Sequence, residues 1–240
     1  MQSMTHDSRR HAIFFDLDHT LVDTDRADDA AFLAVGELLV GSGVDPDALQ
    51  KTFTAAVDVQ PFSPAPEVAV MVWREQLWRQ ALAAQNPELA ERASDVCAFF
   101  YGERLRNFHF SASVSEMLVV LAQEYRLAVI TNGPGLIQRP KLEACRASDF
   151  FPHILVSGEF GLAKPAPEIF HEACRLVGCK PSDAIHVGDS LAADIQGGIN
   201  AGLRATVWLT ANPTGQAKVR PTAVLNELTG LPALLPGFFS

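Results

Sequence analysis

The chain has 240 residues, of which 48% are hydrophobic and 20% are charged, a balance typical of a globular protein with a sizeable core. Its formal net charge of −9 argues against binding to a nucleic acid polymer, which needs a basic surface, but one cationic pocket would suffice for a small phosphorylated molecule. The four cysteines form no CxxC pair, so they predict reduced thiols and no zinc site.

The sequence predicts neither export nor membrane insertion. Its first residues, MQSMTHDSRRHA, are charged and lack the apolar stretch of a signal peptide. No apolar run reaches the roughly 20 residues that a membrane span requires. We therefore expect a cytoplasmic protein.

Short apolar runs predict strands that are buried on both faces of a parallel sheet. The first run precedes Asp16, and the others lie in the second half of the chain. The runs are HAIFF (11–15), LAVI (127–130), ILV (154–156), AIHV (184–187) and ATVWL (205–209). His186, inside one run, is expected to be a satisfied core residue.

Helical patterns separate these strands. Ser113 to Glu116 spells a capping box, and Pro167 and Gly178 are placed to begin and end another helix. A further helix is expected over residues 191–202, weakened by its two adjacent glycines, and a short one near the C-terminal end. Strands that alternate with helices predict a doubly wound parallel α/β sheet.

Residues 23–110 interrupt this alternation with helical patterns only. Helices are expected over 25–40, 46–57 and 67–84 and from Asn86-Pro87 onward, with a loop at 61–66. We therefore expect two domains: an α/β core of residues 1–22 and 111–240, and an all-helical domain of residues 23–110 inserted after the first strand.

Polar groups follow the predicted strands at the points where they end. Ligands of open α/β sheets bind outside the carboxyl ends of the strands, so we expect these groups to meet at one edge. They are Asp16, Asp18 and Thr20; Thr131, Asn132 and Gly133; Lys164 and Pro165; and Gly188, Asp189 and Ser190, with Asp194 a little further on.

Such a set of side chains suits phosphoryl chemistry. Two carboxylates about 4 Å apart repel by about 4 kcal/mol at an effective dielectric of about 20, a cost that a divalent cation relieves. Oxygen ligands favour Mg²⁺. One carboxylate can then act as nucleophile, another can transfer a proton, and a lysine and a hydroxyl can hold the phosphoryl oxygens.

The segments DLDHT, TNG, KP and GDSLAAD resemble, in order, the four motifs of the haloacid dehalogenase-like hydrolase superfamily. The resemblance covers residues 11–26 and 112–209. It implies a Rossmann-like core and makes the helical insert a C1 cap. It also implies a Mg²⁺-dependent phosphatase that acts on a small phosphorylated metabolite through an aspartyl-phosphate.

The resemblance further assigns roles to individual residues. Asp16 would attack phosphorus, and Asp18 would protonate the leaving oxygen and then activate water. Thr131 and the backbone near Asn132 would bind phosphate, and Lys164 would neutralise Asp16 and the phosphoryl group.

The metal site follows from the same resemblance. Mg²⁺ would rest on the Asp16 carboxylate, the Asp18 backbone carbonyl and Asp189. Asp194 would contact these ligands without touching the ion, or would bind the ion through a water molecule. Thr20 would help to fix the loop after the nucleophile.

Three alternatives to a phosphatase are considered. A 2-haloacid dehalogenase uses the first aspartate as nucleophile but keeps no second aspartate two residues later, so Asp18 favours a phosphatase. A phosphomutase keeps both aspartates. A binding module without catalysis is disfavoured because no motif residue is missing.

Residues 187–209 are similar to the corresponding stretch of N-acylneuraminate-9-phosphatases and of pyrimidine nucleotide 5′-phosphatases. Arg74 and Trp78 form an Arg-x-x-x-Trp pattern that we associate with both subgroups, and this spacing places both side chains on one helix face. Arg74 is a candidate contact for an anionic part of the substrate. Trp73, in contrast, is expected in the core. A sugar phosphate such as N-acylneuraminate 9-phosphate is the first choice, and a nucleoside monophosphate the second. Pro134 and Pro140 depart from the pattern, and Pro140 is expected to start or kink its helix.

Overall fold

A computed structural model describes residues 10–59, 67–213 and 218–239. The chain divides into two compact units. The core unit comprises Met1–Val22 and Phe110–Ser240, and the helical unit comprises Asp23–His109. The loop expected at 61–66 lies outside the described residues. No helix in the described ranges is long and apolar enough to cross a bilayer.

The core unit contains a six-stranded parallel sheet in the order β3-β2-β1-β4-β5-β6, which confirms the predicted α/β class. Its strands are β1 (Ala12–Phe15), β2 (Arg126–Thr131), β3 (His153–Val156), β4 (Ala184–Gly188), β5 (Ala205–Leu209) and β6 (Ala223–Leu225). The sixth strand was not expected, because three residues at the edge of a sheet give no distinct pattern.

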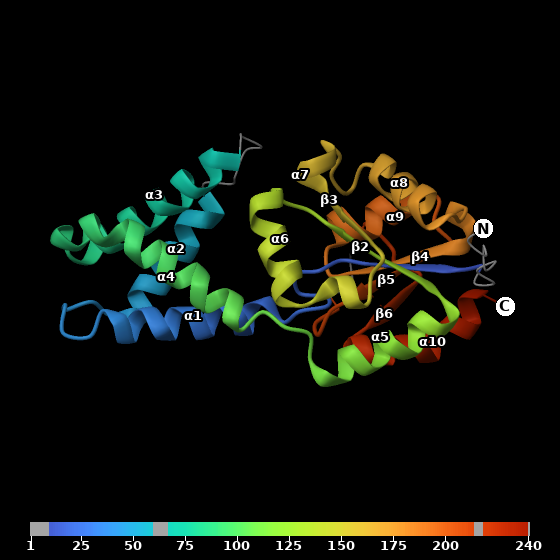
Figure 1. The fold of residues 1–240 in the computed structure, drawn as a ribbon, viewed down its shortest axis with the longest axis horizontal. Helices are drawn as coiled ribbons and strands as arrows, with labels where there is room; N and C mark the ends of the chain where they lie inside the picture. The colour runs from blue at the N-terminus through green and yellow to red at the C-terminus, as the bar shows by residue number, and fades with distance from the viewer. Residues whose placement is uncertain (1–9, 60–66, 214–217, 240) are drawn as a thin grey trace, which may run out of the picture. The chain divides into compact units, whose positions relative to one another are not determined.

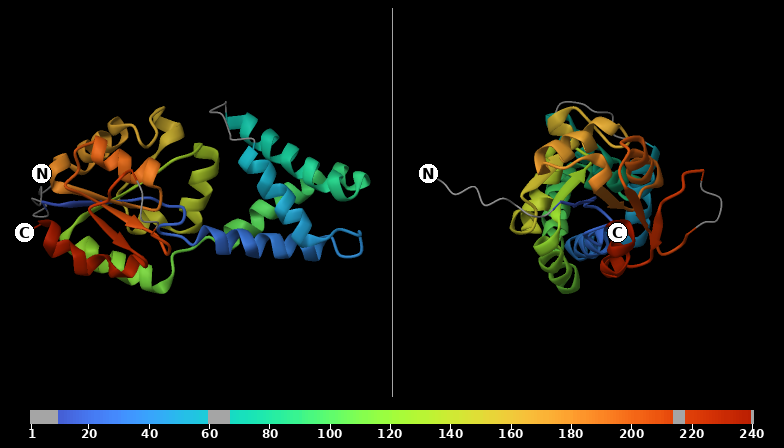
Figure 2. Two further views of the ribbon diagram at one scale, coloured as in Figure 1. Left: turned by 180° about the vertical axis from the view of Figure 1, so that it is seen from behind. Right: turned by 90° about the vertical axis from the view of Figure 1, so that its right-hand side faces the viewer.

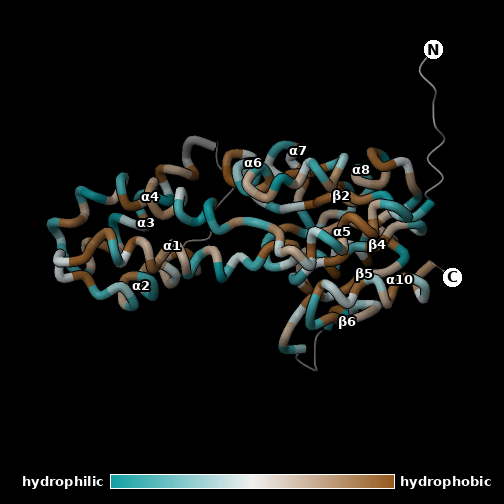
Figure 3. The backbone as a smooth tube through the Cα atoms, turned by 60° about the horizontal axis from the view of Figure 1, so that its bottom comes forward, coloured by the Kyte–Doolittle hydropathy of each residue, from teal (hydrophilic) through white to brown (hydrophobic). Residues whose placement is uncertain are grey.

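Helices cover both faces of this sheet (Figures 1 and 2). One face carries α5 (Ala112–Glu124) and α10 (Leu231–Phe239), and the other carries α8 (Pro167–Val177) and α9 (Gln196–Asn200). Phe14, Ile130 and Phe170 belong to the buried cluster between the sheet and α8. Figure 3 shows hydrophobic residues concentrated along β2, β4 and β5, as strands covered on both faces require.

The predicted capping box of α5 is wrong by two residues. The helix begins at Ala112, and the hydroxyl of Ser111 accepts a hydrogen bond from the Val114 amide at 3.2 Å. Ser113 therefore lies inside the first turn. The prediction for α8 is confirmed, since it begins at Pro167 and ends before Gly178, whose φ of 70° suits glycine.

The segment expected as one helix over 191–202 contains a π-helical turn, Leu191–Ile195, followed by α9. Its glycines allow close packing. A Cβ atom on Gly197 would lie 2.5 Å from Cε2 of Phe170, and one on Gly198 would lie 2.5 Å from Cγ2 of Thr206. An alanine at either position would therefore force its neighbours to move, whatever its helix propensity.

The helical unit contains α1 (Thr24–Leu38), α2 (Pro46–Val59), α3 (Glu67–Gln85), a 3₁₀ segment (Pro87–Arg92) and α4 (Ala93–Arg106). Asn86 caps the 3₁₀ segment through its side chain, so the helix expected from Asn86-Pro87 onward begins as a 3₁₀ segment. Trp78 is fully buried against Phe32, Phe53 and Phe100. Trp73, which was expected in the core, packs against this cluster but is only half-buried.

Candidate active site

The strands β2, β1 and β4 bring the predicted groups to one edge of the sheet. Thr131 is the last residue of β2, Asp16 follows β1, and Asp189 follows β4. The Asp16 amide donates to the Val187 carbonyl at 2.9 Å, so Asp16 continues the pairing one residue beyond the strand. Parallel neighbours end on the same side, which explains the convergence.

Lys164 links the ends of three strands. Its Nζ atom lies 2.5 Å from Oδ1 of Asp16, 2.7 Å from Oδ1 of Asp194 and 2.8 Å from the carbonyl oxygen of Ile130. The side chain is buried, and burial alone would lower the pKa of Lys164, but the carboxylates of Asp16 and Asp194 outweigh this effect and raise it. Lys164 is therefore held as a cation beside Asp16.

Asp194 is fixed from several sides. Its carboxylate accepts hydrogen bonds from Nε2 of His186 at 2.8 Å and from the Ser190 amide at 3.0 Å. Burial raises the pKa of Asp194, but Lys164 and His186 outweigh it and hold the pKa below its ordinary value. A Cβ atom on Gly188 would lie 2.3 Å from Cγ of Asp194, so the glycine makes room for this carboxylate. His186 is buried as expected, but its Nδ1 atom has no partner within the described chain.

The carboxylates at this edge suit a divalent cation. Asp16, Asp189 and Asp194 each offer an oxygen, and these oxygens lie within 4.8 Å of one another. Burial raises the pKa of Asp16 and of Asp189, in both cases assisted by the Asp194 charge. Such crowding of negative charge is what a bound cation relieves, so the residues fit the predicted Mg²⁺.

Asp18 is held by a helix that the motif analysis did not include. Nζ of Lys141 lies 2.7 Å and 2.9 Å from the two carboxylate oxygens of Asp18, and Nε2 of Gln138 donates to one of them at 2.9 Å. Both side chains come from α6 (Gly135–Ala144). Their spacing places them on the buried face of α6 with Leu142, and a lysine on an otherwise buried face was the signal that could have identified Lys141.

Thr131 and Asn132 occupy different surroundings. The Thr131 hydroxyl accepts a hydrogen bond from Gln138 at 2.5 Å and is buried. The Asn132 side chain donates to the Lys164 carbonyl and accepts from the Lys164 amide, both at 2.9 Å. Asn132 therefore fixes the Lys164 backbone with its side chain, which leaves only its backbone for phosphate.

The loop after Asp16 is fixed by its backbone. The amides of Thr20, Leu21 and Val22 all donate to the Leu17 carbonyl, and His19 adopts a positive φ of 55°. The hydroxyl of Thr20 is buried without a partner among the residues that the structure describes.

The helix α6 does not start at Pro140. Pro134 occupies the N-cap position, and the helix continues from Gly135 through Pro140 to Ala144. Proline lacks an amide hydrogen, so it forms no hydrogen bond to the preceding turn at Leu136, whose side chain is exposed. Gln138 and Lys141 lie on either side of Pro140 and still share the buried face.

Arg74 lies on α3 of the helical unit, whereas the four motifs belong to the core unit. Its guanidinium carbon lies 4.0 Å from the centroid of the Tyr101 ring on α4. Its Nε atom is buried without a hydrogen-bond partner in the described part of the chain. Trp78, the other member of the pair, belongs to the buried cluster of the helical unit.

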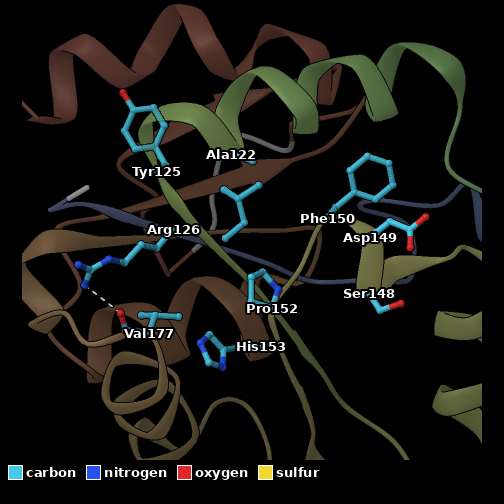
Figure 4. Close-up of a pocket in the computed structure, with 10 residues that line it drawn as sticks. Ala122, Tyr125, Arg126, Ser148, Asp149, Phe150, Pro152, His153 and Val177 are labelled. Carbon is cyan, nitrogen blue, oxygen red and sulfur yellow. Dashed lines mark hydrogen bonds between the residues drawn. The ribbon is translucent and has the colours of Figure 1, made fainter. Parts of the chain in front are cut away.

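A pocket of about 340 Å³ lies at the opposite end of the sheet (Figure 4), where β2 and β3 begin. It is lined by residues that include Arg126, Asp149 and His153. Arg126 donates to the Val177 carbonyl at 2.9 Å, and Asp149 forms an ion pair with Arg146. The pocket is remote from the carboxylates of Asp16 and Asp189, because these follow the carboxyl ends of β1 and β4 and the pocket lies where β2 and β3 begin.

Comparison with known proteins agrees with this geometry. The sequence profile of the haloacid dehalogenase-like hydrolases matches residues 11–202. The chain belongs to this family. It is thus a hydrolase, and the resemblance inferred from the motifs is confirmed.

Relatives within the family include phosphatases. The chain is 36% identical to N-acylneuraminate-9-phosphatase of Homo sapiens over 238 residues, which cover 95% of this chain and 94% of the relative. It is 39% identical to pyrimidine 5′-nucleotidase YjjG of Escherichia coli over 112 residues, 46% of this chain and 49% of the relative.

Solved structures of haloacid dehalogenase-like hydrolases share the fold. A 2-haloacid dehalogenase from Pseudomonas syringae has a TM-score of 0.66 and 27% identity, over 95% of this chain and 99% of that one. A HAD-hydrolase, YfnB, from Bacillus subtilis, whose structure is bound to magnesium, has a TM-score of 0.70 and 21% identity over the same shares.

Proposed function

We propose that this hydrolase is a Mg²⁺-dependent phosphatase whose substrate is a sugar phosphate of the N-acylneuraminate 9-phosphate kind. The observation that carries the proposal is the Asp16–Lys164 contact beside Asp189 and Asp194, because the side chains suited to act as nucleophile, neutralising cation and metal ligands lie together there. The similarity to N-acylneuraminate-9-phosphatase over nearly the whole chain supports the substrate.

The reaction would proceed in two displacements at phosphorus. An Asp16 oxygen bonds to phosphorus as the bond to the ester oxygen breaks, and Asp18 gives its proton to that leaving oxygen. Water then attacks the phosphorus and loses a proton to Asp18, while the Asp16–phosphorus bond breaks and releases phosphate. Lys164, Thr131 and the backbone near Asn132 would hold the phosphoryl oxygens.

The Asp16 carboxylate, the Asp18 backbone carbonyl and Asp189 would hold Mg²⁺, which neutralises negative charge on the phosphoryl group when bound. Asp194 would support this site through Lys164, with which it forms an ion pair. Thr20 would contribute to the loop that carries Asp18.

Residues 23–110 would act as a cap that excludes water during the reaction. Arg74 would bind the carboxylate of the substrate, in keeping with its partnerless Nε atom. We place the reaction in the cytoplasm, in keeping with four cysteines that form no disulfide.

A nucleoside 5′-monophosphate is the second candidate substrate, and the partial similarity to pyrimidine 5′-nucleotidase YjjG favours it. A phosphomutase and a 2-haloacid dehalogenase rank lower. Asp18 supports phosphoryl transfer over dehalogenation, because a phosphate ester needs an acid for its leaving group.

The proposal is tested by turnover of p-nitrophenyl phosphate, sugar phosphates and nucleoside monophosphates with Mg²⁺. We expect Asp16→Asn to reduce turnover of all of them by at least about 10⁴-fold, because removing a nucleophile removes the covalent route. Activity that persists in Asp16→Asn would contradict the mechanism. Chloroacetate turnover without phosphatase activity would identify a dehalogenase, and a higher kcat/KM for UMP would select the nucleotidase.

A further inference from the structure

We propose that Lys141 is a positioning residue of this reaction, which orients the Asp18 carboxylate for the step in which water hydrolyses the aspartyl-phosphate. The proposal rests on the proposed phosphatase function. None of the four motifs includes Lys141, and it follows from the contacts of α6.

The contact is charged, short and enclosed. The ammonium of Lys141 lies within 2.9 Å of both Asp18 oxygens, and the Lys141 side chain is only 8% exposed. A lysine is rarely buried unless it is paired, so the ion pair with Asp18 accounts for a lysine at this buried position. An ammonium that contacts both oxygens restricts rotation of the carboxylate about its last bond.

Gln138 extends this restraint to the phosphate-binding strand. Its amide nitrogen donates to Oδ2 of Asp18 at 2.9 Å and to Oγ1 of Thr131 at 2.5 Å. Gln138 and Lys141 are three residues apart and therefore lie on one face of α6. The same helix thus ties the proton-transfer group to the end of β2.

The two aspartates that follow β1 are each paired with a lysine of their own. Asp16 pairs with Lys164 and Asp18 pairs with Lys141. The pairing orients the Asp18 carboxyl group, which accepts a proton from the attacking water in the second displacement. Lys141 should therefore matter most in the second displacement, where Asp18 acts as a base.

The test uses pre-steady-state kinetics of the full chain with Mg²⁺ and p-nitrophenyl phosphate, whose leaving group needs no acid. We expect Lys141→Met to retain the rate of the first p-nitrophenol release within about 3-fold. Its steady-state kcat should fall by about 10- to 100-fold, within the range for proton-transfer catalysis. A burst of p-nitrophenol should precede the slow phase, and intact mass should show one added phosphoryl group.

A double-mutant cycle shows whether Lys141 acts through Asp18. In the Asp18→Asn background, Lys141→Met should change kcat by less than about 2-fold, because the group it orients has lost its charge. An equal cost in both backgrounds would overturn the proposal. So would a Lys141→Met variant whose burst and steady-state rates fall in proportion.

Arg139→Met is the matched control, because Arg139 lies on the same helix but pairs with Glu159 and is 47% exposed. It should keep wild-type kinetics, and Lys141→Arg should recover most of the activity. If circular dichroism shows that Lys141→Met does not fold, Lys141→Gln is measured in the same way. A wild-type chain that hydrolyses no phosphate ester would instead refute the proposed function.

Discussion

Arg74 on α3 combines a packed side chain with an unused hydrogen-bond donor. Its guanidinium stacks on Tyr101, and its Nε atom is buried without a partner in the described ranges. Burial lowers the pKa of Arg74, but a guanidinium remains charged at neutral pH. A cation that an aromatic ring already orients loses little entropy when it binds an anion.

We expect Arg74→Met to raise KM for a carboxylate-bearing sugar phosphate by about 10- to 100-fold, because a hydrogen bond to a charged group contributes about 1.5–3 kcal/mol. KM for p-nitrophenyl phosphate, which has no carboxylate, should change by less than about 2-fold. Steady-state kinetics with Mg²⁺ measures both. Tyr101→Phe, which keeps the ring, serves as the control, and equal effects on both substrates would contradict the assignment.

Two helices of the core unit depend on contacts that lie outside the helices themselves. α9 approaches α8 closely because Gly197 presents no Cβ atom to Phe170. α6 keeps its helical course through Pro140, while its buried face carries Gln138 and Lys141 to the site. In both cases tertiary packing outweighs helix propensity.

We expect Gly197→Ala to destabilise the protein by about 1–3 kcal/mol, because its Cβ atom would overlap the Phe170 ring. Gly102→Ala is the matched control, since Gly102 lies in α4 with no atom within 4 Å of the added Cβ. That change should stabilise the helical unit by about 0.5–1 kcal/mol. Urea unfolding followed by circular dichroism measures both, and equal signs would contradict the packing explanation.

At the scale of the whole molecule, the core unit gathers three carboxylates at one edge of its sheet. Asp16, Asp189 and Asp194 crowd together, with Lys164 paired to two of them. Ligands that bind only the folded state stabilise it, so a cation at this edge should stabilise the core unit.

We expect Mg²⁺ at about 100 times its Kd to stabilise the core unit by about 2.7 kcal/mol relative to a chelated sample. This corresponds to a Tm increase of roughly 5–10 °C for a chain of this size. Differential scanning calorimetry measures the shift. Asp189→Asn should abolish most of it, and a variant that retains the full shift would place the cation elsewhere.

Much of the core fold could be predicted because its signals are local. The five apolar runs that precede polar groups became β1 to β5, and Pro167 and Gly178 marked the ends of α8. The start of α5 predicted from the capping box at Ser113 was wrong, because Ser111 offered an equally suitable hydroxyl two residues earlier. β6 was missed because an edge strand of three residues carries too little pattern.

The sequence alone determined that Asp16, Thr131 and Asp189 would meet, because the carboxyl ends of parallel strands share one edge whatever the length of the connections. Only the tertiary structure decided which cation accompanies Asp18. Lys141 is 123 residues away in the chain, on a helix whose rotation sets which side chains face the sheet. That rotation depends on the packing of the whole face of α6, and no single residue of the motif encodes it.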